Sequence, residues 1–259
     1  MPTAPLMQPA PEFVAPLLDD LAPQIYMHRI TPTAGTMALN ADILVIGGGA
    51  AGLSTAYFLA KGGADVLLVD RDEVAMAAST ANAGSLHVQL LSYDFTGDTP
   101  PDGGPASHTL PLAPRSIALW KEIAAEAGDN LGIRTEGGLM LAEDKAGVAW
   151  LRRKSDMERR WGIESHIVGQ NELRTLAPAL SDRMLGADFV PAEGYGDPLR
   201  GMMALLTLAQ RQRARLLRGA EVQAIERAGA VWQVTTTKGV ITAGSLMPPD
   251  HGRRELDAW

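Results

Sequence analysis

The sequence contains no cysteine. Disulfides, thiolate metal ligands and cysteine nucleophiles are therefore excluded together. The absence is compatible with a reducing cytosol, and we expect a cytoplasmic protein. Because the side chains offer no thiol–disulfide couple, any redox chemistry has to come from a bound cofactor.

Positive charge is also in deficit. The 23 lysine and arginine residues face 30 aspartate and glutamate residues, so the formal net charge is −7. Sequence-independent binding to a phosphate backbone depends on a surplus of cations on one surface. We therefore expect no nucleic acid partner. The five histidines are scattered without ligand spacing, so no metal is expected either.

Aromatic residues are sparse, at 5% of the chain, whereas hydrophobic residues make up 46% and charged residues 20%. These last two values are ordinary for a globular protein. A chain of 259 residues can bury a substantial core, either as one large domain or as two small ones.

Residues 1–40 are rich in proline. Proline lacks an N–H donor and disfavours both helix and central strand, so we expect a flexible N-terminal arm over residues 1–40. The arm is a tail, the product of a misassigned start codon, or a docking segment. It lacks the basic start and unbroken apolar core of a secretory signal.

Residues 43–60 raise the question of a membrane span, because these 18 consecutive residues carry no charge. Four glycines fall in the first half of the run, where they would weaken a helix, and a lysine ends it at position 61. A strand, a turn and a helix explain the same residues better. We therefore expect no transmembrane segment.

A glycine motif lies at the centre of that run. Ile43–Ile46 predict a short buried strand, and apolar residues recur at helical spacing from position 53 to 60. Between them, Gly47 permits a tight turn, Gly49 lets the backbone approach a pyrophosphate, and Gly52 lets the helix pack closely on the strand.

The same unit continues to a second strand, Val66–Val69, which ends in Asp70. The pyrophosphate would meet free N–H groups around Ala51, at the positive end of the helix. The Asp70 carboxylate is placed to accept hydrogen bonds from ribose hydroxyls. The unit predicts a dinucleotide site, and by itself it serves FAD and NAD(P) alike.

Residues 77–85, AASTANAGS, are all small or polar. The pairing of the glycine unit with this A-S-T-x-N-A-G segment resembles the FAD-dependent amine and amino-acid oxidoreductases. That family includes D-amino-acid oxidase, glycine oxidase, sarcosine oxidase and D-amino-acid dehydrogenase. The resemblance implies FAD as the cofactor, with an NAD(P)-dependent oxidoreductase as the weaker alternative.

The resemblance also implies roles for individual residues. Ser79 and Thr80 would bond the cofactor, and Ala83 and Gly84 would lie close to the flavin ring. Asp70 would hold the adenosine ribose. The remaining cofactor contacts that the resemblance implies are Arg71, near the adenine, and the backbone of Val222, beside it.

Later segments follow the family in order. Residues 114–128 have helical spacing, residues 136–142 predict a strand, and the G-x-x-D-P segment at 194–198 precedes a helical run over 199–217. Residues 231–234 and 240–243 then predict a hairpin around Lys238 and Gly239. We expect the arginines of the run at 211–218 to lie on a solvated helix face.

The fold class implied is α/β, a Rossmann-type FAD-binding domain with an inserted α+β substrate domain. The FAD-binding domain would comprise residues 41–91 and 198–244, and the substrate domain residues 92–197. Residues 94–107, rich in glycine, proline and aspartate, predict an exposed loop.

The family pattern stops after Gly244. Residues 245–259 are polar and broken by proline, so we expect an aberrant tail and a fold incomplete at the C-terminus. The positions that usually carry the family's substrate-binding arginine are absent. A frameshifted or prematurely ended gene explains this most simply, and completion by another polypeptide is the alternative.

The reaction that the resemblance implies is oxidation of a small amine or amino acid. A hydride passes to the flavin, the imine hydrolyses, and oxygen or another acceptor takes the electrons. His87 and Tyr195 are candidate substrate contacts, with ordinary structural roles as the competing interpretation; no catalytic residue is assigned.

The alternative hypothesis is a catalytically inactive FAD-binding remnant or subunit. A second subunit or a separate electron acceptor would be its partner. Relatives that pass electrons to the respiratory chain are peripheral membrane proteins, which leaves attachment to the inner face of a membrane open.

Overall fold

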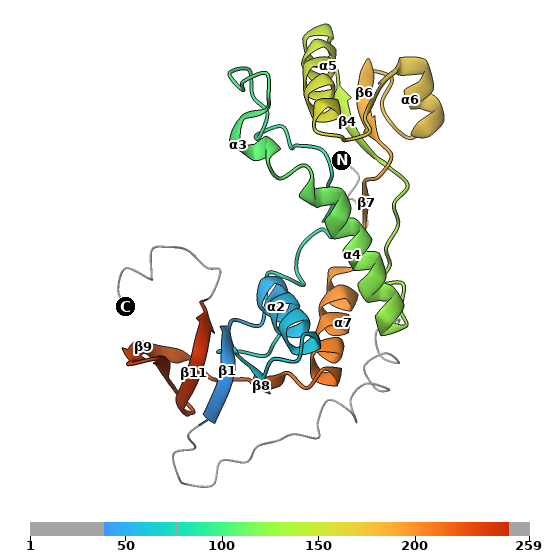
Figure 1. The fold of residues 1–259 in the computed structure, drawn as a ribbon. Helices are drawn as coiled ribbons and strands as arrows, with labels where there is room; N and C mark the ends of the chain where they lie inside the picture. The colour runs from blue at the N-terminus through green and yellow to red at the C-terminus, as the bar shows by residue number, and fades with distance from the viewer. Residues whose placement is uncertain (1–38, 76, 249–259) are drawn as a thin grey trace, which may run out of the picture. The chain divides into compact units, whose positions relative to one another are not determined.

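The structure is a computed structural model that describes residues 39–75 and 77–248, all within one compact unit. Its elements are shown in Figure 1. In chain order they are β1 (Leu39–Ile46), α2 (Ala50–Lys61), β2 (Val66–Val69), β3 (Ser85–Leu86), α3 (Gly104–Ser107), α4 (Leu112–Ala127), β4 (Gly138–Ala142), α5 (Lys145–Arg160), β5 (His166–Gly169), α6 (Gln170–Leu176), β6 (Gly186–Val190), β7 (Gly194–Tyr195), α7 (Pro198–Arg211), β8 (Arg215–Leu217), β9 (Val222–Ala228), β10 (Val231–Thr236) and β11 (Gly239–Met247).

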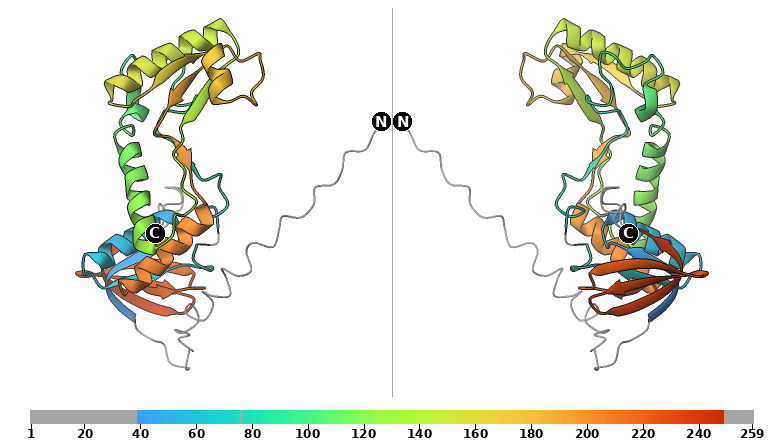
Figure 2. Two further views of the ribbon diagram at one scale, coloured as in Figure 1. Left: turned by 90° about the vertical axis from the view of Figure 1, so that its right-hand side faces the viewer. Right: turned by 90° about the vertical axis from the view of Figure 1, so that its left-hand side faces the viewer.

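The larger sheet has six strands in the order β8-β2-β1-β11-β10-β9. Strands β8, β2, β1 and β11 run parallel, and β11, β10 and β9 pair antiparallel. Figure 2 shows the late strands beside β1. All four residues of β2 are buried, as expected for a strand covered on both faces.

One face of this sheet is covered by helices α2 and α7, which pack against each other. Apolar residues of α2 recur at the spacing of one helix face, so that Leu53, Ala56 and Tyr57 are buried together. On the other face, Leu44 and Leu67 pack with Val234 and Ile241.

Residues between β3 and β7 form a second, smaller sheet with helices packed on it. This sheet has the antiparallel order β4-β6-β5, and α5 packs on β4, β5 and β6. Strands β3 and β7 pair with each other as a separate two-stranded ribbon, with Ser85 opposite Tyr195 and Leu86 opposite Gly194. The ribbon therefore brings together segments that are far apart in the sequence.

The predicted fold class is confirmed: the chain has an α/β unit of Rossmann type and an inserted α+β part. The predicted boundaries of the two domains stay a prediction. The N-terminal arm lies outside the described residues, except that Leu39 and Asn40 belong to β1 and pair with β11. The prediction of a flexible arm is therefore wrong for residues 39 and 40, and it stays a prediction for residues 1–38.

The predicted start of an aberrant tail at residue 245 is wrong. Strand β11 continues to Met247, and Ser245, Leu246 and Met247 lie opposite Ile43, Leu44 and Val45 of β1. The interpretation failed because the polar, proline-broken character of residues 245–259 as a whole was extended to residues 245–247, whereas Leu246 packs against the core. Residues 249–259 lie outside the described part of the chain.

The helix predicted over residues 199–217 is also wrong in its last third, over residues 212–217. Helix α7 ends at Arg211, and Arg213 adopts a left-handed conformation with φ of 69°. The N–H of Ala214 then bonds the carbonyl of Ala209, which is the pattern of a helix C-terminus. Residues 215–217 form the edge strand β8 instead.

The arginines of that run therefore do not share a helix face. Arg215 lies in β8 and pairs with Asp65, with Nη2 2.7 Å from Oδ2. Arg218 follows β8 and pairs with Glu73 at 3.2 Å. Both contacts are partly exposed, so each contributes at most about 1 kcal/mol.

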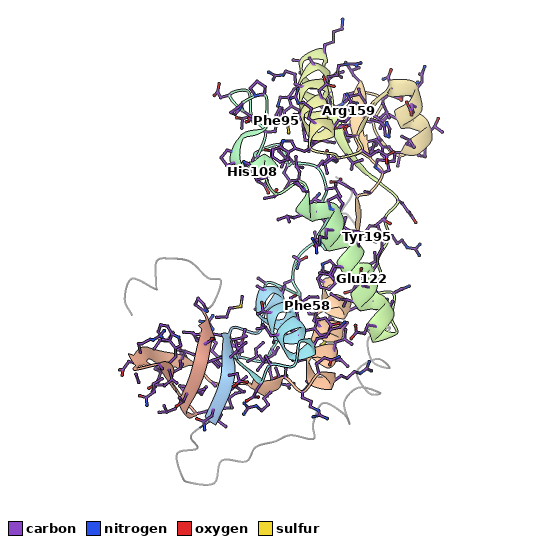
Figure 3. All side chains as sticks on the ribbon, in the orientation of Figure 1. Phe58, Phe95, His108, Glu122, Arg159 and Tyr195 are labelled. Atoms are coloured by element: carbon purple, nitrogen blue, oxygen red, sulfur yellow. The ribbon has the colours of Figure 1, made fainter. Side chains whose placement is uncertain are left out.

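The loop predicted over residues 94–107 is only partly exposed. Phe95 is buried and packs edge-on against Trp150 of α5, with ring centroids 5.8 Å apart. Figure 3 labels Phe95 beside this helix. Residues 104–107 form the short helix α3, and Ser107 is buried. The apolar Phe95 anchors the segment because burying its ring removes a large apolar surface from water.

In the part of the chain that the structure describes, no helix has the length and apolar character needed to cross a membrane.

Candidate functional site

The glycine loop joins the end of β1 to the start of α2. Gly47 has φ of 99°, a conformation that L side chains rarely adopt. A Cβ atom on Gly52 would overlap the carbonyl oxygen of Gly47. The first and third glycines of the motif are thus required by the turn itself and by the close packing of α2 on it.

Asp70 lies at the carboxyl end of β2 and faces this loop. Its Oδ2 accepts a hydrogen bond from the N–H of Gly48 at 2.5 Å, and its Oδ1 accepts one from the N–H of Asp72 at 2.8 Å. A carboxylate has about four acceptor positions, so Asp70 can still accept further hydrogen bonds from hydroxyl groups. The neighbouring Arg71 is exposed and pairs with Asp72.

The segment after β2 returns to the N-terminus of α2. Ser79 Oγ accepts a hydrogen bond from the N–H of Ala50 at 3.0 Å. A Cβ atom on Gly49 would lie only 3.0 Å from the same oxygen, so glycine at this position leaves room for the serine. Within the described residues, the Ser79 hydroxyl donates to no other group.

The same helix end offers free donors. The N–H groups of Ala51 and Gly52 lie in the first turn of α2, where no carbonyl of a preceding turn is available. Within the described residues they have no hydrogen-bond partner. Such N–H groups, at the positive end of the helix dipole, suit an anion such as a diphosphate.

Residues 80–84 form a compact turn beyond Ser79. The hydroxyl of Thr80 donates to the carbonyl of Ala77, and Asn82 holds the turn from both ends. The Nδ2 of Asn82 donates to the carbonyl of Ser79 at 2.8 Å, and its Oδ1 accepts the N–H of Gly84 at 2.8 Å. The side chain of Asn82 thereby fixes the path of the segment.

Gly84 is in close contact with the segment after β7. Its carbonyl accepts the N–H of Gly196 at 2.9 Å, and a Cβ atom on Gly84 would overlap the carbonyl oxygen of Gly196. Gly84 also has φ of 69°. Glycine at this position is therefore needed both for the backbone conformation and for the contact.

A pocket of about 160 Å³ opens beside this turn. Ser79, Asn82 and Gly84 line one part of it, and another part is lined by Gly196, Asp197, Pro198, Gly201 and Met202. Its apolar lining comes from Leu86, Trp120, Leu131, Ile133 and Met202. Ser79 therefore belongs both to the wall of this pocket and to the surroundings of the N-terminal end of α2.

Several of the residues predicted for the site do not line this pocket. Neither His87 nor Tyr195 lines the pocket. Tyr195 is 53% exposed on β7 (Figure 3), and His87 lies with Nδ1 3.8 Å from Glu193 Oε1. Ala83 is exposed, and Val222 starts β9 and packs on the core. The substrate roles of His87 and Tyr195 and the adenine contact of Val222 stay predictions.

Two kinds of residue were missed by the sequence interpretation. Asn82 stands inside the small-residue segment, and its amide could have marked it as the residue that holds the turn. Trp120 on α4 carries no local signal, because it reaches the pocket only through the packing of α4 on α7.

The residues present fit a dinucleotide such as FAD, in which a diphosphate joins the adenosine to a second ring system. Asp70 has free acceptor positions for ribose hydroxyls, and the first turn of α2 offers donors to a diphosphate. The Ser79 hydroxyl is free to donate toward the same diphosphate. The pocket beyond Ser79, with apolar and polar walls, has the character of a cofactor site.

Comparisons with known proteins agree with this arrangement. Residues 42–247 match the model of the family described as DAO, FAD dependent oxidoreductase. Human mitochondrial sarcosine dehydrogenase is 28% identical over 213 residues, which cover 81% of this chain and 22% of that protein. One of the subunits of the opine oxidase of Rhizobium meliloti is 28% identical over 213 residues, covering 78% of this chain and 52% of that protein.

Solved structures give the same result. The glycine oxidase of Bacillus cereus superimposes with a TM-score of 0.67 at 26% identity, over 80% of this chain and 54% of that one. The chain thus spans only 22% of the length of the human relative and about half of the solved structure. Since the family match extends over most of the sequence, the chain belongs to the FAD dependent oxidoreductase family, with FAD as its cofactor.

Proposed function

We propose that this chain forms the FAD-binding part of an oxidoreductase that oxidises a small amine or amino acid. The observation that carries the proposal is the position of Ser79. Its oxygen accepts the Ala50 N–H at the end of α2, and the same residue lines the pocket. One segment therefore connects a diphosphate site to a cavity beyond it.

Each part of the site has a role in this proposal. The free acceptor positions of Asp70 bind the adenosine ribose, and the N–H groups of Ala51 and Gly52 bind the diphosphate. Gly84 lets the backbone come close to the flavin ring, as its left-handed conformation and its contact with Gly196 allow. Arg71 and Val222 are the proposed neighbours of the adenine.

Bound FAD would supply the two-electron acceptor for hydride removal from the carbon that carries nitrogen, leaving an imine that water hydrolyses. The relatives are named for sarcosine, dimethylglycine and N-methyl-L-tryptophan, which are N-methylated amino acids. We therefore favour a substrate with an amine and a carboxylate on the same carbon framework.

The described pocket does not provide an anchor for such a carboxylate. None of the residues that line it is lysine or arginine, and Asp197 is acidic. A carboxylate is best bound by a guanidinium or by several hydrogen-bond donors. We propose that a second polypeptide or another part of the protein supplies this contact. The relative from Rhizobium meliloti supports this, since its name describes one subunit of an opine oxidase.

The location we propose is the cytoplasm, because a chain without cysteine suits a reducing compartment. Attachment to the inner face of a membrane through an electron-accepting partner is compatible with this location.

The proposal is tested by titrating the purified protein with FAD and with NAD⁺ or NADP⁺. Flavin fluorescence and the visible absorption band report FAD binding, and dye-linked oxidation of glycine, sarcosine and D-amino acids reports turnover. We expect saturable FAD binding and no binding of the nicotinamide dinucleotides. A protein that binds NAD⁺ but not FAD would contradict the proposal.

The titration and the dye-linked assay together distinguish an active enzyme from a remnant that binds FAD without turnover. FAD binding with substrate-dependent dye reduction, by this chain alone or after addition of a partner, supports the oxidoreductase. FAD binding without turnover under any of these conditions supports the inactive alternative.

A further inference from the structure

A buried carboxylate holds the chain that follows β3. Glu193 is 5% exposed, and its Oε1 accepts the backbone N–H groups of Val88 at 2.7 Å and Gln89 at 2.9 Å. Its Oε2 accepts the side-chain amide of Gln89 at 2.8 Å. Both carboxylate oxygens are thus bonded to two consecutive residues that lie more than 100 positions away in the sequence.

The contact continues into a buried ionic cluster on α5. Lys154 Nζ donates to Gln89 Oε1 at 3.0 Å and lies 2.7 Å from Glu158 Oε1 and 3.6 Å from Asp188 Oδ2. Glu158 also accepts the N–H of Leu90 at 2.7 Å. Residues 88–90 are therefore held by one carboxylate after β6 and by another on α5.

This arrangement is costly for the fold. Lys154, Glu158 and Asp188 are fully buried, and removing charged groups from water costs several kcal/mol for each ion before pairing offsets it. Glu158 Oε2 and Asp188 Oδ2 have no hydrogen-bond partner in the described structure. Gly138 leaves the space for Glu193, because a Cβ atom there would overlap its carboxylate. Because replacement of a buried ionic cluster by well-packed apolar residues is often neutral or stabilising, stability alone does not explain these polar groups.

The position of Glu193 provides that explanation. The residue directly precedes β7, and the residues that it holds, Val88 and Gln89, follow the end of β3 after His87 alone. Leu86 of β3 and Gly196 after β7 both line the pocket. One side chain thus fixes the relative position of the two strands whose ends form a wall of the candidate cofactor site.

We propose that Glu193 is a positioning residue, which through Gln89 and Lys154 sets the placement of the β3–β7 ribbon against bound FAD. The effect on FAD binding rests on the proposed function. The claim that Glu193 fixes the β3–β7 ribbon does not depend on any ligand. If Glu193 had only a structural role, it would stabilise the inserted part as a whole and would have no specific effect on the position of the β3–β7 ribbon.

The experiment uses Glu193→Gln and the double variant Glu193→Gln with Gln89→Glu. The single change places an amide donor opposite the amide donor of Gln89. The double change restores an acceptor at position 89 for the new amide and for Lys154. Ser165→Ala is the matched control, because Ser165 bonds Asp188 at 2.5 Å in the same buried cluster but does not contact residues 88–90.

Two readouts are compared. Amide hydrogen exchange in FAD-free protein is measured for residues 84–87 and 194–197, and FAD affinity is measured by fluorescence titration. We expect Glu193→Gln to speed exchange in both segments and to raise the FAD dissociation constant, each by about tenfold, as for loss of a charge-assisted hydrogen bond. The double variant restores both values to within about threefold. Ser165→Ala lowers the unfolding midpoint and leaves both values unchanged.

The inference is wrong if Glu193→Gln lowers the unfolding midpoint as Ser165→Ala does while exchange in the ribbon stays at the wild-type rate. If Glu193→Gln does not fold, Gln89→Leu tests the same contact from its other side, with faster ribbon exchange expected and an unchanged rate contradicting the inference. If the wild-type protein binds no FAD, the proposed function fails, and the exchange measurement still decides whether Glu193 positions the ribbon.

Discussion

The hydroxyl oxygen of Ser79 accepts a hydrogen bond from the backbone N–H of Ala50, across 3.0 Å and 29 positions of sequence. This bond connects the segment after β2 to the first turn of α2, where a diphosphate would be bound. It also leaves the O–H of Ser79 free to donate, because this hydroxyl donates no hydrogen bond within the described residues. The serine thus occupies the boundary between the glycine loop and the pocket.

Replacement of this serine weakens cofactor binding. Ser79→Ala removes the proposed hydrogen bond to the cofactor, of about 1 kcal/mol, so the FAD dissociation constant is expected to rise about fivefold. Ser79→Thr, which retains a hydroxyl, serves as the control. Fluorescence titration of the three proteins checks the prediction, and equal affinities for Ser79→Ala and wild type would show that the hydroxyl contributes nothing.

Substitution of the third glycine of the motif destabilises the fold. Gly52→Ala places a Cβ atom onto the carbonyl oxygen of Gly47, and we expect a loss of about 2–3 kcal/mol in the free energy of unfolding. Gly97→Ala is the control, because a Cβ atom there meets no atom within 4 Å. Denaturant unfolding of both variants gives the comparison, and equal losses would mean that the overlap is relieved by a small shift of α2.

Removal of backbone strain after α7 stabilises the chain. Arg213 adopts φ of 69°, which is unfavourable for a residue with a Cβ atom and natural for glycine. We expect Arg213→Gly to raise the free energy of unfolding by about 0.5–1 kcal/mol. Arg211→Gly, at the last residue of α7, should instead lower it, because glycine is a poorer helix former than arginine. A fall in stability for Arg213→Gly would show that its side chain matters more than its backbone.

The buried acids of α5 and β6 make stability depend on pH. Burial raises the pKa of Glu158 and of Asp188 above the ordinary carboxyl value. The folded state therefore favours the protonated forms, and their contribution to stability is present below the ordinary pKa of about 4 and is lost as pH rises through the raised value.

Glu158→Gln tests this dependence, because it removes the ionisation. Between pH ~5 and ~8, we expect the denaturant midpoint of the wild type to fall more steeply with pH than that of Glu158→Gln. The control is Glu136→Gln, which removes the same charge from an exposed side chain paired with Arg134. A wild-type slope retained in Glu158→Gln would contradict the assigned cause.

The glycine unit was predictable because all its signals are local. The buried strand, the three glycines, the helix face and Asp70 occur in order within about thirty residues, and each follows from short-range sterics or periodicity. The prediction of β2 agrees with its observed bounds. The choice of FAD depended on residues 78–84, which follow directly in the chain.

Other elements could not be placed from the sequence. The alternating arginines near residue 215 resemble a helix face as much as an edge strand, and only the pairing of β8 with β2 decides between them. In the same way, residues 245–247 look like a polar tail until they are seen opposite β1. Short apolar or mixed runs take the structure of the neighbour with which they pair.

The sequence by itself determined the dinucleotide-binding unit, because the required conformations belong to residues that are near one another in the chain. The choice of FAD came from the resemblance of residues 78–84 to the FAD-dependent family. Only the tertiary structure decided which side chains form the pocket wall and which groups are buried with charge. Glu193 and Gln89 are 104 positions apart, and no local pattern marks either one. Their contact arises because pairing of β3 with β7 brings the two segments together, and long-range packing of this kind leaves no periodic signature in the sequence.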